Sequence, residues 1–333
     1  MAATYRAMML TKKGWLEALQ VVELPIQPPG PGQLRVRVLA AGVGSTDLMM
    51  FAGNYMFAPK IPFVPGYEVA GVVEAIAPGV TGFELGQRVA ALTVYGAFAE
   101  ILVREAEDFV PIPNGVSDRD AAAVVLNYVT AWQMIHRVAK VRSGQTALVT
   151  AAAGGVGTAA LQLLRLAGVK AYGAASASKH GAVRSLGAIP IDYKAGPIDR
   201  LTRVLEPEGV DYVFDAVGGA NIGPCIGALR RGGTLVAFGF VSASGRLSQL
   251  AMILNLFVGA RLRGRVGTFY GITRLYRKDP KPLHEDLPKI FALVADKKID
   301  PLVDRTFPLL DAKKALELLA AGSVVGKIVL TNG

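Results

Sequence analysis

The sequence predicts an α/β protein of two domains, because two different patterns follow one another along its 333 residues. The first 110 residues alternate short β-like runs with Gly and Pro, which is typical of a compact and mostly β domain. From residue 146 onward, short apolar strands alternate with helical segments, which indicates a doubly wound parallel sheet. A glycine-rich junction, AAAGGVG at 151–157, lies between the first of these strands and its helix.

In the first domain, the run 34–43 alternates apolar and basic residues, as a strand with one wet face does. Helical spacing begins after Ser117, which has the composition of a helix N-cap, with Asp120 three residues further on. Three further runs are expected to be strands: 67–77, 88–94 and 97–103.

In the second domain we expect helices over 156–167 and 179–188. A mixed segment follows residue 267, with an amphipathic helix over 311–322 and a closing strand over 326–332. The expected strands of the parallel sheet are 146–151, 169–175, 189–193, 211–219 and 232–240. The expected domain limits are 1–125, 126–267 and 268–333.

The formal net charge of +10 raises the question of an anionic partner. The basic residues are scattered, apart from Arg261, Arg263 and Arg265, and no aromatic residues are interleaved with them. Nucleic acid is therefore not expected as a partner, and the phosphates of a bound cofactor explain the charge more economically. Cys225 is the one cysteine, so no disulfide within the chain can form, and we expect a buried structural thiol.

No signal-peptide pattern opens the sequence. The apolar run 250–260 is shorter than the about 20 residues that span a bilayer, and it suits a core helix or a dimer-facing helix. The sequence therefore predicts a cytoplasmic protein without stable membrane insertion.

The glycine-rich junction has the spacing of the dinucleotide fingerprint G-x-G-x-x-G, with Ala152, Gly154 and Gly157 at its three glycine positions. The second position lets a pyrophosphate approach the backbone, and the third lets the helix pack closely on the strand. Alanine is tolerable at the first position if its φ is negative. The alternative is a plain glycine-rich turn. The residues expected to cradle the pyrophosphate are Ala153, Gly154, Gly155, Val156 and Gly157.

The sequence after this junction indicates which dinucleotide binds. An NAD site has an acidic residue about 20 residues further on, but 158–191 contains none. The end of the second strand offers Ser176, Ser178 and Lys179 instead, two hydroxyls and a cation that suit a 2′-phosphate. The cofactor is therefore predicted to be NADPH. The alternative for Lys179 is a solvated lysine at a helix start.

With these features established, the chain resembles the zinc-independent quinone oxidoreductases of the medium-chain dehydrogenase/reductase superfamily, and among them the vesicle amine transport protein homologues. The resemblance covers nearly the whole chain. The superfamily blocks are 40–55, 65–76, 152–163 and 325–330, and the closer likeness lies in 125–132, 175–180 and 190–193.

The resemblance implies a GroES-like, mostly β catalytic domain and a Rossmann domain, with 268–333 returning to the catalytic domain. It implies an oxidoreductase that holds NADPH in the cleft between the domains and forms a homodimer by joining Rossmann sheet edges. Tyr193 would flank the 2′-phosphate, although it could equally be a packing aromatic. The other cofactor residues implied by position are Asn127, Thr130, Ser176, Lys179, Gly218, Phe238, Gly239 and Phe269.

Departures from the zinc-dependent relatives predict that no metal is bound. Those alcohol dehydrogenases have a cysteine at the position of Gly44 and a histidine at that of Tyr67, and the remaining Glu68 cannot hold zinc alone. Many quinone reductases have asparagine at Gly44 and tyrosine at Met49, and both polar groups are missing here. Tyr55 matches a family tyrosine near the nicotinamide.

The predicted reaction is hydride transfer from NADPH to a small-molecule electron acceptor, a quinone or an α,β-unsaturated carbonyl. Tyr55 or a water would protonate or hydrogen-bond the developing enolate oxygen, and Tyr55 and Tyr67 would contact the acceptor. The alternative for Tyr55 is an aromatic that fills the cleft mouth. His136 in a helix and His284 in a late loop are expected to be structural or solvated.

Two other functions remain open at this point. One is a nucleotide-binding scaffold or membrane-peripheral protein with weak catalysis, which the run 250–260 and the missing polar residues suggest. The other is a zinc-less relative of the alcohol dehydrogenases that uses another acceptor.

Overall fold

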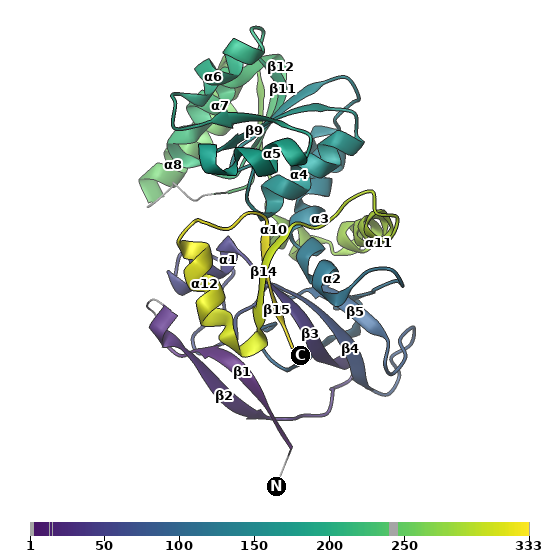
Figure 1. The fold of residues 1–333 in the computed structure, drawn as a ribbon. Coiled ribbons are helices and arrows are strands. Elements are labelled where there is room, and N and C mark those ends of the chain that lie inside the picture. Colours follow the sequence, from purple (N-terminus) through teal and green to yellow (C-terminus); the bar gives the residue numbers. More distant parts are fainter. Residues whose placement is uncertain (1–2, 13, 15, 240–245, 333) are drawn as a thin grey trace. The chain divides into compact units, whose positions relative to one another are not determined.

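The computed structural model describes residues 3–12, 14, 16–239 and 246–332, and the chain divides into two compact units (Figure 1). Unit 1 comprises Met1–Val129 and Thr273–Gly333, and unit 2 comprises Thr130–Ile272. The C-terminal segment therefore belongs to the same unit as the N-terminal strands. The domain limits expected from the sequence, 1–125, 126–267 and 268–333, stay a prediction.

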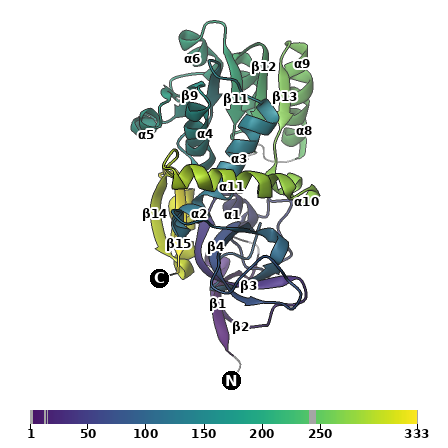
Figure 2. The same cartoon turned by 90° about the vertical axis from the view of Figure 1, so that its right-hand side faces the viewer.

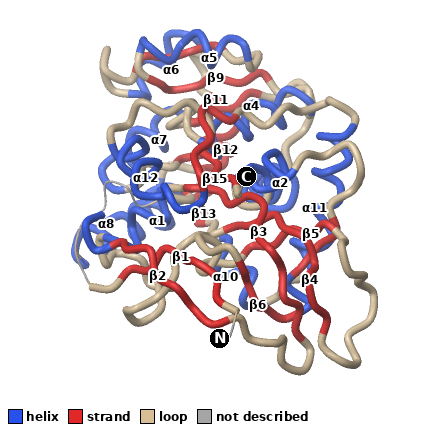
Figure 3. The backbone as a smooth tube through the Cα atoms, turned by 60° about the horizontal axis from the view of Figure 1, so that its bottom comes forward, coloured by secondary structure: helices blue, strands red, loops and turns tan. Residues whose placement is uncertain are grey.

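Unit 1 is built on a mainly antiparallel sheet of seven strands, several of which lie side by side in Figure 3. Its longest strand buries Leu34, Val36 and Val38, while Arg35 and Arg37 between them reach Glu74 on the neighbouring strand. This alternation is the one expected for 34–43. In order across the sheet the strands are β14 (Val303–Pro308), β15 (Lys327–Thr331), β3 (Gln33–Val43), β4 (Glu68–Ile76), β5 (Arg88–Leu92) and β7 (Phe109–Pro111), with β6 (Ile101–Glu105) paired to β3; β1 (Thr4–Leu10) and β2 (Leu19–Pro25) form a separate hairpin.

Helices pack against this sheet. The predicted N-cap is confirmed, because the Ser117 hydroxyl accepts the Asp120 N–H at 3.1 Å at the start of the helix that contacts β3 and β4. The helices of unit 1 are α1 (Ser45–Phe51), α2 (Asp118–Val124), α11 (Lys281–Ala295) and α12 (Ala312–Ala320), with the short turns η1 (Leu16–Ala18), η2 (Ala106–Asp108) and η7 (Leu309–Asp311); α3 (Asn127–Trp132) and α10 (Ile272–Lys278) contain the boundaries with unit 2.

Unit 2 is built on a six-stranded sheet in which every pair of neighbours is parallel. The chain fills one half of the sheet and then returns to fill the other, so the direction reverses between two central strands. This order is that of a doubly wound Rossmann sheet, as predicted. Across the sheet the strands are β10 (Ile189–Asp192), β9 (Lys170–Ala175), β8 (Thr146–Val149), β11 (Val210–Asp215), β12 (Leu229–Ala237) and β13 (Val266–Phe269).

Helices lie on both sides of this sheet (Figures 1 and 2). Ile222, Ile226 and Leu256 contribute to the core on one side, and Cys225 is fully buried among them, as expected. The elements of unit 2 are η3 (Gln133–Ala139), α4 (Gly155–Leu166), η4 (Ala177–Lys179), α5 (His180–Ser185), α6 (Ile198–Leu205), η5 (Gly219–Asn221), α7 (Ile222–Ala228), α8 (Arg246–Leu254), η6 (Asn255–Gly259) and α9 (Ala260–Leu262).

Some expected elements differ from the structure. The strand expected over 97–103 begins only at Ile101, because the N–H groups of Ala97 and Phe98 bond the loop carbonyls of Gly66 and Pro65. The strand expected over 232–240 ends at Ala237, and residue 240 lies outside the described residues.

Two helical segments also differ. The helix expected after Ser117 is interrupted near Leu126, whose N–H bonds the buried Glu68 carboxylate at 2.6 Å. His284 lies within α11 rather than in a loop. Among residues 3–12, 14, 16–239 and 246–332, none of the helices combines the length and apolar character that a membrane crossing requires.

The start of α4 packs unusually closely on the loop after β8. Ala151 takes a positive φ of 48°, and Ala152, the alanine at the first fingerprint position, is not among the residues with positive φ. A Cβ atom at Gly157 would lie 2.4 Å from the Ala151 carbonyl oxygen. The third fingerprint glycine therefore has the role expected from the sequence, which is to let the helix approach the strand.

We expect Gly157→Ala to lower the free energy of unfolding by about 2 kcal/mol, because the new methyl group collides with a backbone oxygen rather than a movable side chain. The matched control is Gly181→Ala at the start of α5, where nothing lies within 4 Å of the added Cβ. That substitution should be neutral or stabilise the fold by less than about 1 kcal/mol. Denaturant unfolding measures both, and equal effects would contradict this account of Gly157.

Candidate functional site

The loop between β8 and α4 presents backbone N–H groups at the carboxyl edge of the unit 2 sheet. Gly154 is the N-cap of α4, and its N–H bonds the Ala151 carbonyl at 2.9 Å. The next three N–H groups, of Gly155, Val156 and Gly157, belong to the first helical turn and have no partner within the helix. They form a cradle at the positive end of the helix dipole, which suits an anionic phosphate.

A buried carboxylate, which the sequence analysis did not identify, fixes the neighbouring loop. Asp215 ends β11 and is fully buried. It accepts the Thr150 hydroxyl at 2.6 Å, the Gly218 N–H at 2.8 Å and the Asn221 side-chain N–H at 2.8 Å. Asp215 therefore ties the loop after β8 to the loop after β11, where the sheet changes direction. The sequence pattern that could have indicated this residue is an aspartate at the end of an apolar strand, with two glycines three and four residues further on.

Gly218 and Gly239 lie at this same edge, and the local backbone at each position disfavours a side chain. A Cβ atom at Gly239 would lie 1.9 Å from the Ala216 carbonyl oxygen, and Gly218 takes a positive φ of 68°. Phe238 continues the pairing of β12 with β11 by one residue, because its N–H bonds the Asp215 carbonyl at 2.9 Å. The backbones of the loops after β11 and β12 are therefore in direct contact. Because positions 218 and 239 have no Cβ atom, neither of them fills the space at this edge of the sheet.

The polar residues predicted for a 2′-phosphate follow β9 directly. The hydroxyls of Ser176 and Ser178 lie 3.3 Å apart, and Lys179 ends the short turn η4. Asp192 pairs in register with Ala175, so Tyr193 comes next to the same carboxyl edge, where 52% of its surface is exposed. An exposed Tyr193 at this edge agrees with the prediction that its ring flanks a 2′-phosphate. That role stays a prediction.

Asn127 and Thr130 both lie on α3, and both are almost fully buried. The Thr130 hydroxyl has no hydrogen-bond partner, although buried polar atoms normally have one. A bound ligand with a polar group beside Thr130 would supply the missing hydrogen bond. Phe269 ends β13 and packs against the core of unit 2, so its predicted contact with a cofactor stays a prediction.

In unit 1, three hydroxyl groups meet at one point. The Tyr55 hydroxyl lies 2.5 Å from that of Tyr67 and 2.7 Å from that of Thr273, and Tyr67 and Thr273 are also hydrogen-bonded to each other. The two tyrosines were predicted from the sequence, but Thr273 was not, because it lies more than 200 positions away in the chain. We call these three residues the hydroxyl cluster.

The environment of the hydroxyl cluster keeps its phenols protonated. Burial raises the pKa of Tyr55, and its hydrogen bonds to Thr273 and Tyr67 oppose that rise. Burial also raises the pKa of Tyr67 well above its ordinary value. The Arg277 guanidinium is near enough to lower the pKa of both phenols, and it stacks over the Phe57 ring at 5.0 Å. The cluster can therefore donate a hydrogen bond to a polarised oxygen at neutral pH.

Close to Gly44, unit 1 buries three ionisable side chains, Asp47, Glu68 and Lys327. Lys327 forms an ion pair with Glu68, and the second Glu68 oxygen accepts the Leu126 N–H at 2.6 Å. Asp47 accepts the Gly44 N–H at 2.9 Å. Lys327 and Asp47 were missed by the sequence analysis, because only the fold brings the final strand β15 beside β3. A buried carboxylate is stable only with such partners.

No cluster of three or more His, Cys, Asp or Glu side chains suited to a metal occurs in the part of the chain that the structure describes. Gly44 has no donor atom, and Tyr67 is engaged in the hydroxyl cluster. Cys225, fully buried in the core of unit 2, has its pKa raised by burial and by Asp215, so it is a poor nucleophile.

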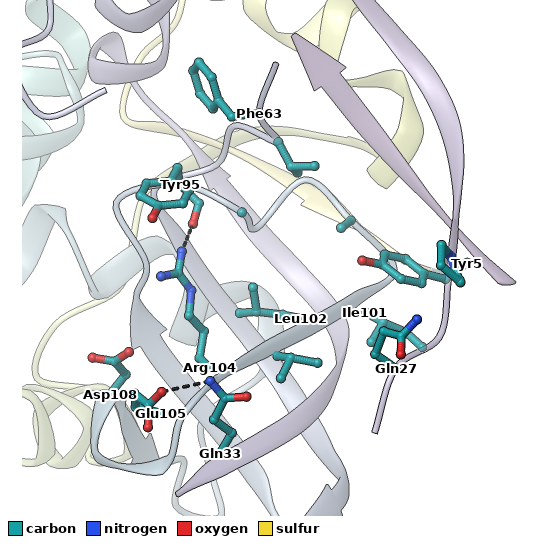
Figure 4. A pocket seen from close by; sticks show the side chains of 15 residues that line it. Tyr5, Gln27, Gln33, Phe63, Tyr95, Ile101, Leu102, Arg104, Glu105 and Asp108 are labelled. Carbon is teal, nitrogen blue, oxygen red and sulfur yellow. Dashed lines mark hydrogen bonds between the residues drawn. The ribbon is translucent and has the colours of Figure 1, made fainter. Parts of the chain in front are cut away.

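A hollow of about 600 Å³ lies elsewhere on unit 1, between β6 and the β1–β2 hairpin (Figure 4). Tyr5, Phe63 and Tyr95 line it, together with Arg104, whose guanidinium stacks over the Tyr95 ring and bonds the Tyr95 carbonyl at 2.5 Å. The hydroxyl cluster does not line this hollow. The polar groups of the hydroxyl cluster converge on one point, whereas Arg104 is engaged in holding a loop.

Fold and site together define the class of the protein. A doubly wound sheet with a glycine loop at its switch point, joined to a mainly antiparallel β unit, is the organisation of a medium-chain dehydrogenase or reductase. Residues 30–114 match the family described as alcohol dehydrogenase GroES-like domain, and residues 186–330 match the family described as zinc-binding dehydrogenase.

Individual relatives agree with this class. A mouse protein named synaptic vesicle membrane protein VAT-1 homolog-like (Mus musculus) is 32% identical over 344 residues, which cover 99% of this chain and 82% of the relative. A quinone oxidoreductase-like protein 2 homolog of Nematostella vectensis is 30% identical, with 99% of this chain and 89% of the relative covered. A mycobacterial protein solved in complex with NADPH is 30% identical, with a TM-score of 0.84 and coverage of 98% and 99%.

The chain therefore belongs to the medium-chain dehydrogenase/reductase superfamily, among the VAT-1 homologues and quinone oxidoreductase-like proteins. This confirms the resemblance seen in the sequence and the predicted fold class.

The buried Asp47 predicts a pH dependence of stability. Burial raises the pKa of Asp47 to about 7 from its ordinary 3.8, although the Gly44 N–H and Lys327 oppose the shift. Between these two pH values the folded chain holds a proton that the unfolded chain has lost, so stability falls as pH rises through this window. The slope contributed by this one group is at most about 1.4 kcal/mol per pH unit.

We expect Asp47→Asn to flatten the decrease of the unfolding free energy between pH 5 and 7, even if it lowers stability at every pH. Urea unfolding at several pH values measures the slope. Glu317→Gln, on the exposed face of α12, removes one carboxylate without touching the buried group and should leave the slope unchanged. A wild-type slope that persists in Asp47→Asn would refute the assignment.

Proposed function

We propose that the protein is an NADPH-dependent reductase that transfers a hydride to a quinone or an α,β-unsaturated carbonyl without a metal. The observation that carries the proposal is the carboxyl edge of the unit 2 sheet. There the glycine loop adjoins Ser176, Ser178 and Lys179, with no acidic residue in 158–191. A 2′-phosphate is attracted to such a set, whereas a carboxylate in that position would repel it.

In this proposal the first-turn N–H groups of α4 bind the pyrophosphate, and Ser176 and Lys179 bind the 2′-phosphate. Tyr193 flanks the adenosine end, and the unpaired Thr130 hydroxyl takes a polar group of the cofactor. The bound cofactor supplies the hydride. The other residues proposed to line its site are Asn127, Ala153, Gly154, Gly155, Val156, Gly157, Gly218, Phe238, Gly239 and Phe269.

The hydroxyl cluster is the proposed acceptor site. Tyr55 donates a hydrogen bond, and then a proton, to the oxygen on which negative charge develops when the acceptor gains a hydride at carbon. Tyr67 and Thr273 orient the Tyr55 hydroxyl, and Arg277 stabilises the phenolate that this donation leaves. A zinc-assisted route is not proposed, because Gly44 and Tyr67 replace the donors that zinc requires.

We expect NADPH to bind more tightly than NADH, and Lys179→Ala to weaken NADPH binding about 10- to 100-fold while NADH binding stays unchanged. Titration of dinucleotide fluorescence measures these affinities. Lys313→Ala on α12 removes an equal charge from unit 1 and should change neither affinity. Equal affinities of the wild type for the two dinucleotides would overturn the cofactor assignment.

We expect Tyr55→Phe to lower kcat about 100-fold with an enone acceptor while NADPH affinity is unchanged, because the variant loses its proton donor but no cofactor contact. An acceptor panel of quinones and enones, read by NADPH absorbance, identifies the substrate on which to test it. Tyr95→Phe, in the hollow away from the cluster, is the matched control. Tight NADPH binding with no acceptor reduced would instead favour a nucleotide-binding scaffold.

We also propose a homodimer, formed through the open edge of β13 and the exposed apolar side chains beside it. Leu250, Leu254, Phe257 and Val258 are about half exposed along α8 and η6, which is unusual for apolar residues on one face. Light scattering that finds only monomers would refute the dimer. The cytoplasmic location expected from the sequence stays a prediction.

A further inference from the structure

A turn of unit 1, formed by Thr93, Val94 and Tyr95, has a strained backbone. We call it the Val94 turn. Val94 takes a positive φ of 65°, and it is the one β-branched residue with positive φ in the part of the chain that the structure describes. A branched side chain at positive φ crowds its own backbone, so such a residue persists only where its surroundings hold it. Thr93 and Val94 are 6% and 4% exposed, so protein groups rather than water must supply that hold.

On one side, the Val94 turn is bonded to the backbone of Tyr67. The N–H groups of Thr93 and Val94 both donate to the Tyr67 carbonyl oxygen, at 2.9 and 3.1 Å. The Thr93 hydroxyl donates to the Gly66 carbonyl oxygen at 2.9 Å. Three hydrogen bonds from two residues of the turn therefore fix the chain at the point where the Tyr67 side chain leaves it.

The position of Tyr67 matters because its ring belongs to the hydroxyl cluster. The Tyr67 side chain is buried, and its hydroxyl is hydrogen-bonded to those of Tyr55 and Thr273. Hydrogen bonds weaken steeply when donor and acceptor are displaced or misaligned. A shift of the Tyr67 backbone would carry the ring with it and would separate its hydroxyl from the other two.

On the other side, the Val94 turn is bonded to Arg104 of β6 (Figure 4). One nitrogen of the Arg104 guanidinium, Nη2, donates to the Thr93 carbonyl oxygen at 3.2 Å and to the Tyr95 carbonyl oxygen at 2.5 Å. The guanidinium also stacks over the Tyr95 ring, 4.6 Å from its centroid, and none of these contacts uses the Tyr95 hydroxyl. Arg104 thus holds the carbonyl groups on both sides of Val94.

The peptide group between Thr93 and Val94 is held at both of its ends. Its N–H bonds the Tyr67 carbonyl, and its own carbonyl bonds Arg104. The φ of Val94 is the rotation that joins this peptide group to the rest of the turn, where the Tyr95 carbonyl is held by the same Arg104 nitrogen. Relaxation of the strained φ would therefore disturb at least one of these hydrogen bonds.

Arg104 has no other hydrogen-bond or ion-pair partner in the described part of the chain, although Glu105 and Asp108 line the same hollow. The Glu105 carboxylate accepts the Gln33 side-chain N–H at 2.8 Å, and the Asp108 carboxylate accepts the Tyr276 hydroxyl at 2.6 Å. The positive charge of Arg104 therefore acts on two backbone carbonyls. Hydrogen bonds from a charged donor are stronger than those between neutral groups, so they can hold a strained turn.

We propose that Arg104 is a positioning residue for the hydroxyl cluster. Its guanidinium holds the Val94 turn in the strained conformation, and the turn holds Tyr67 where its hydroxyl meets those of Tyr55 and Thr273. The structural part of this inference stands by itself. Its effect on turnover rests on the proposed function, in which the cluster donates a proton to the acceptor.

Fluorine NMR of the full chain labelled with 3-fluorotyrosine tests the structural part without a substrate. The resonance that is missing from Tyr67→Phe belongs to Tyr67. We expect Arg104→Met to shift or split this resonance, because methionine fills similar space but donates no hydrogen bond. Val94→Gly should restore the wild-type resonance in the double variant Arg104→Met/Val94→Gly, because glycine takes a positive φ without strain.

Steady-state kinetics test the effect on turnover. With an enone that the wild type reduces, we expect Arg104→Met to lower kcat about 10- to 100-fold, because a small misplacement near the reacting atoms costs that much. NADPH affinity should stay unchanged, and the double variant should recover kcat to within about threefold of the wild type. If Arg104 only stabilised the fold, its loss would lower the free energy of unfolding and leave kcat unchanged.

The matched control is Arg88→Met, because Arg88 also donates to a backbone carbonyl, that of Val116 at 2.6 Å, at the other end of β5 from the Val94 turn. It should leave the Tyr67 resonance unchanged. If Arg104→Met alone does not fold, a double variant that folds with the wild-type resonance supports the proposal. The proposal is overturned if Arg104→Met keeps the wild-type resonance, or if the double variant fails to restore it or fails to fold. If the resonances respond as expected but no acceptor is reduced, the positioning role stands and the proposed function fails.

Discussion

The close approach of α4 to the loop after β8 is the constraint on which the site in unit 2 depends. Only a residue without a side chain at position 157 lets the helix start against the Ala151 carbonyl. That contact aims the first-turn N–H groups of α4 at the sheet edge, and Asp215 holds the adjoining loop after β11 in place. An anion site made of backbone donors is rigid because the donors belong to packed elements rather than to mobile side chains. The arrangement of these backbone donors therefore follows from how the helix packs.

Unit 1 buries polar groups by pairing them with one another and with backbone N–H groups. Glu68 pairs with Lys327 and accepts a backbone N–H, whereas Asp47 accepts hydrogen bonds only from the backbone N–H groups of Gly44 and Gly66 in the described part of the chain. Because Asp47 has only this partial support, burial raises its pKa towards neutrality. The hydroxyl cluster nearby is neutral, and its three hydroxyl groups are hydrogen-bonded to one another. In the proposed function, hydrogen bonds from these hydroxyls polarise the acceptor.

The two edges of the unit 2 sheet have different chemistry because all its strands point the same way. Their carboxyl ends carry glycines and the small polar residues Ser176 and Ser178, which leave room for a nucleotide. Their amino ends carry long cationic side chains such as Arg231 and Arg263, which reach into solvent.

The sequence by itself determined much of the fold. Periodic strands and helices, the spacing of Gly154 and Gly157 and the acid-free segment after them are local features, because each depends on neighbours along the chain. Only the tertiary structure decided the contacts between distant segments. Thr273 joins Tyr55 and Tyr67 across more than 200 residues, and Lys327 reaches Glu68 because β15 pairs with β3. Arg203 and Arg265 donate to the same Leu229 carbonyl where α6, β12 and β13 meet. Periodicity and spacing depend on residues that are close in the sequence, so the glycine loop could be predicted. Contacts between distant segments produce no periodic pattern, so the partners of the buried charges could not be predicted.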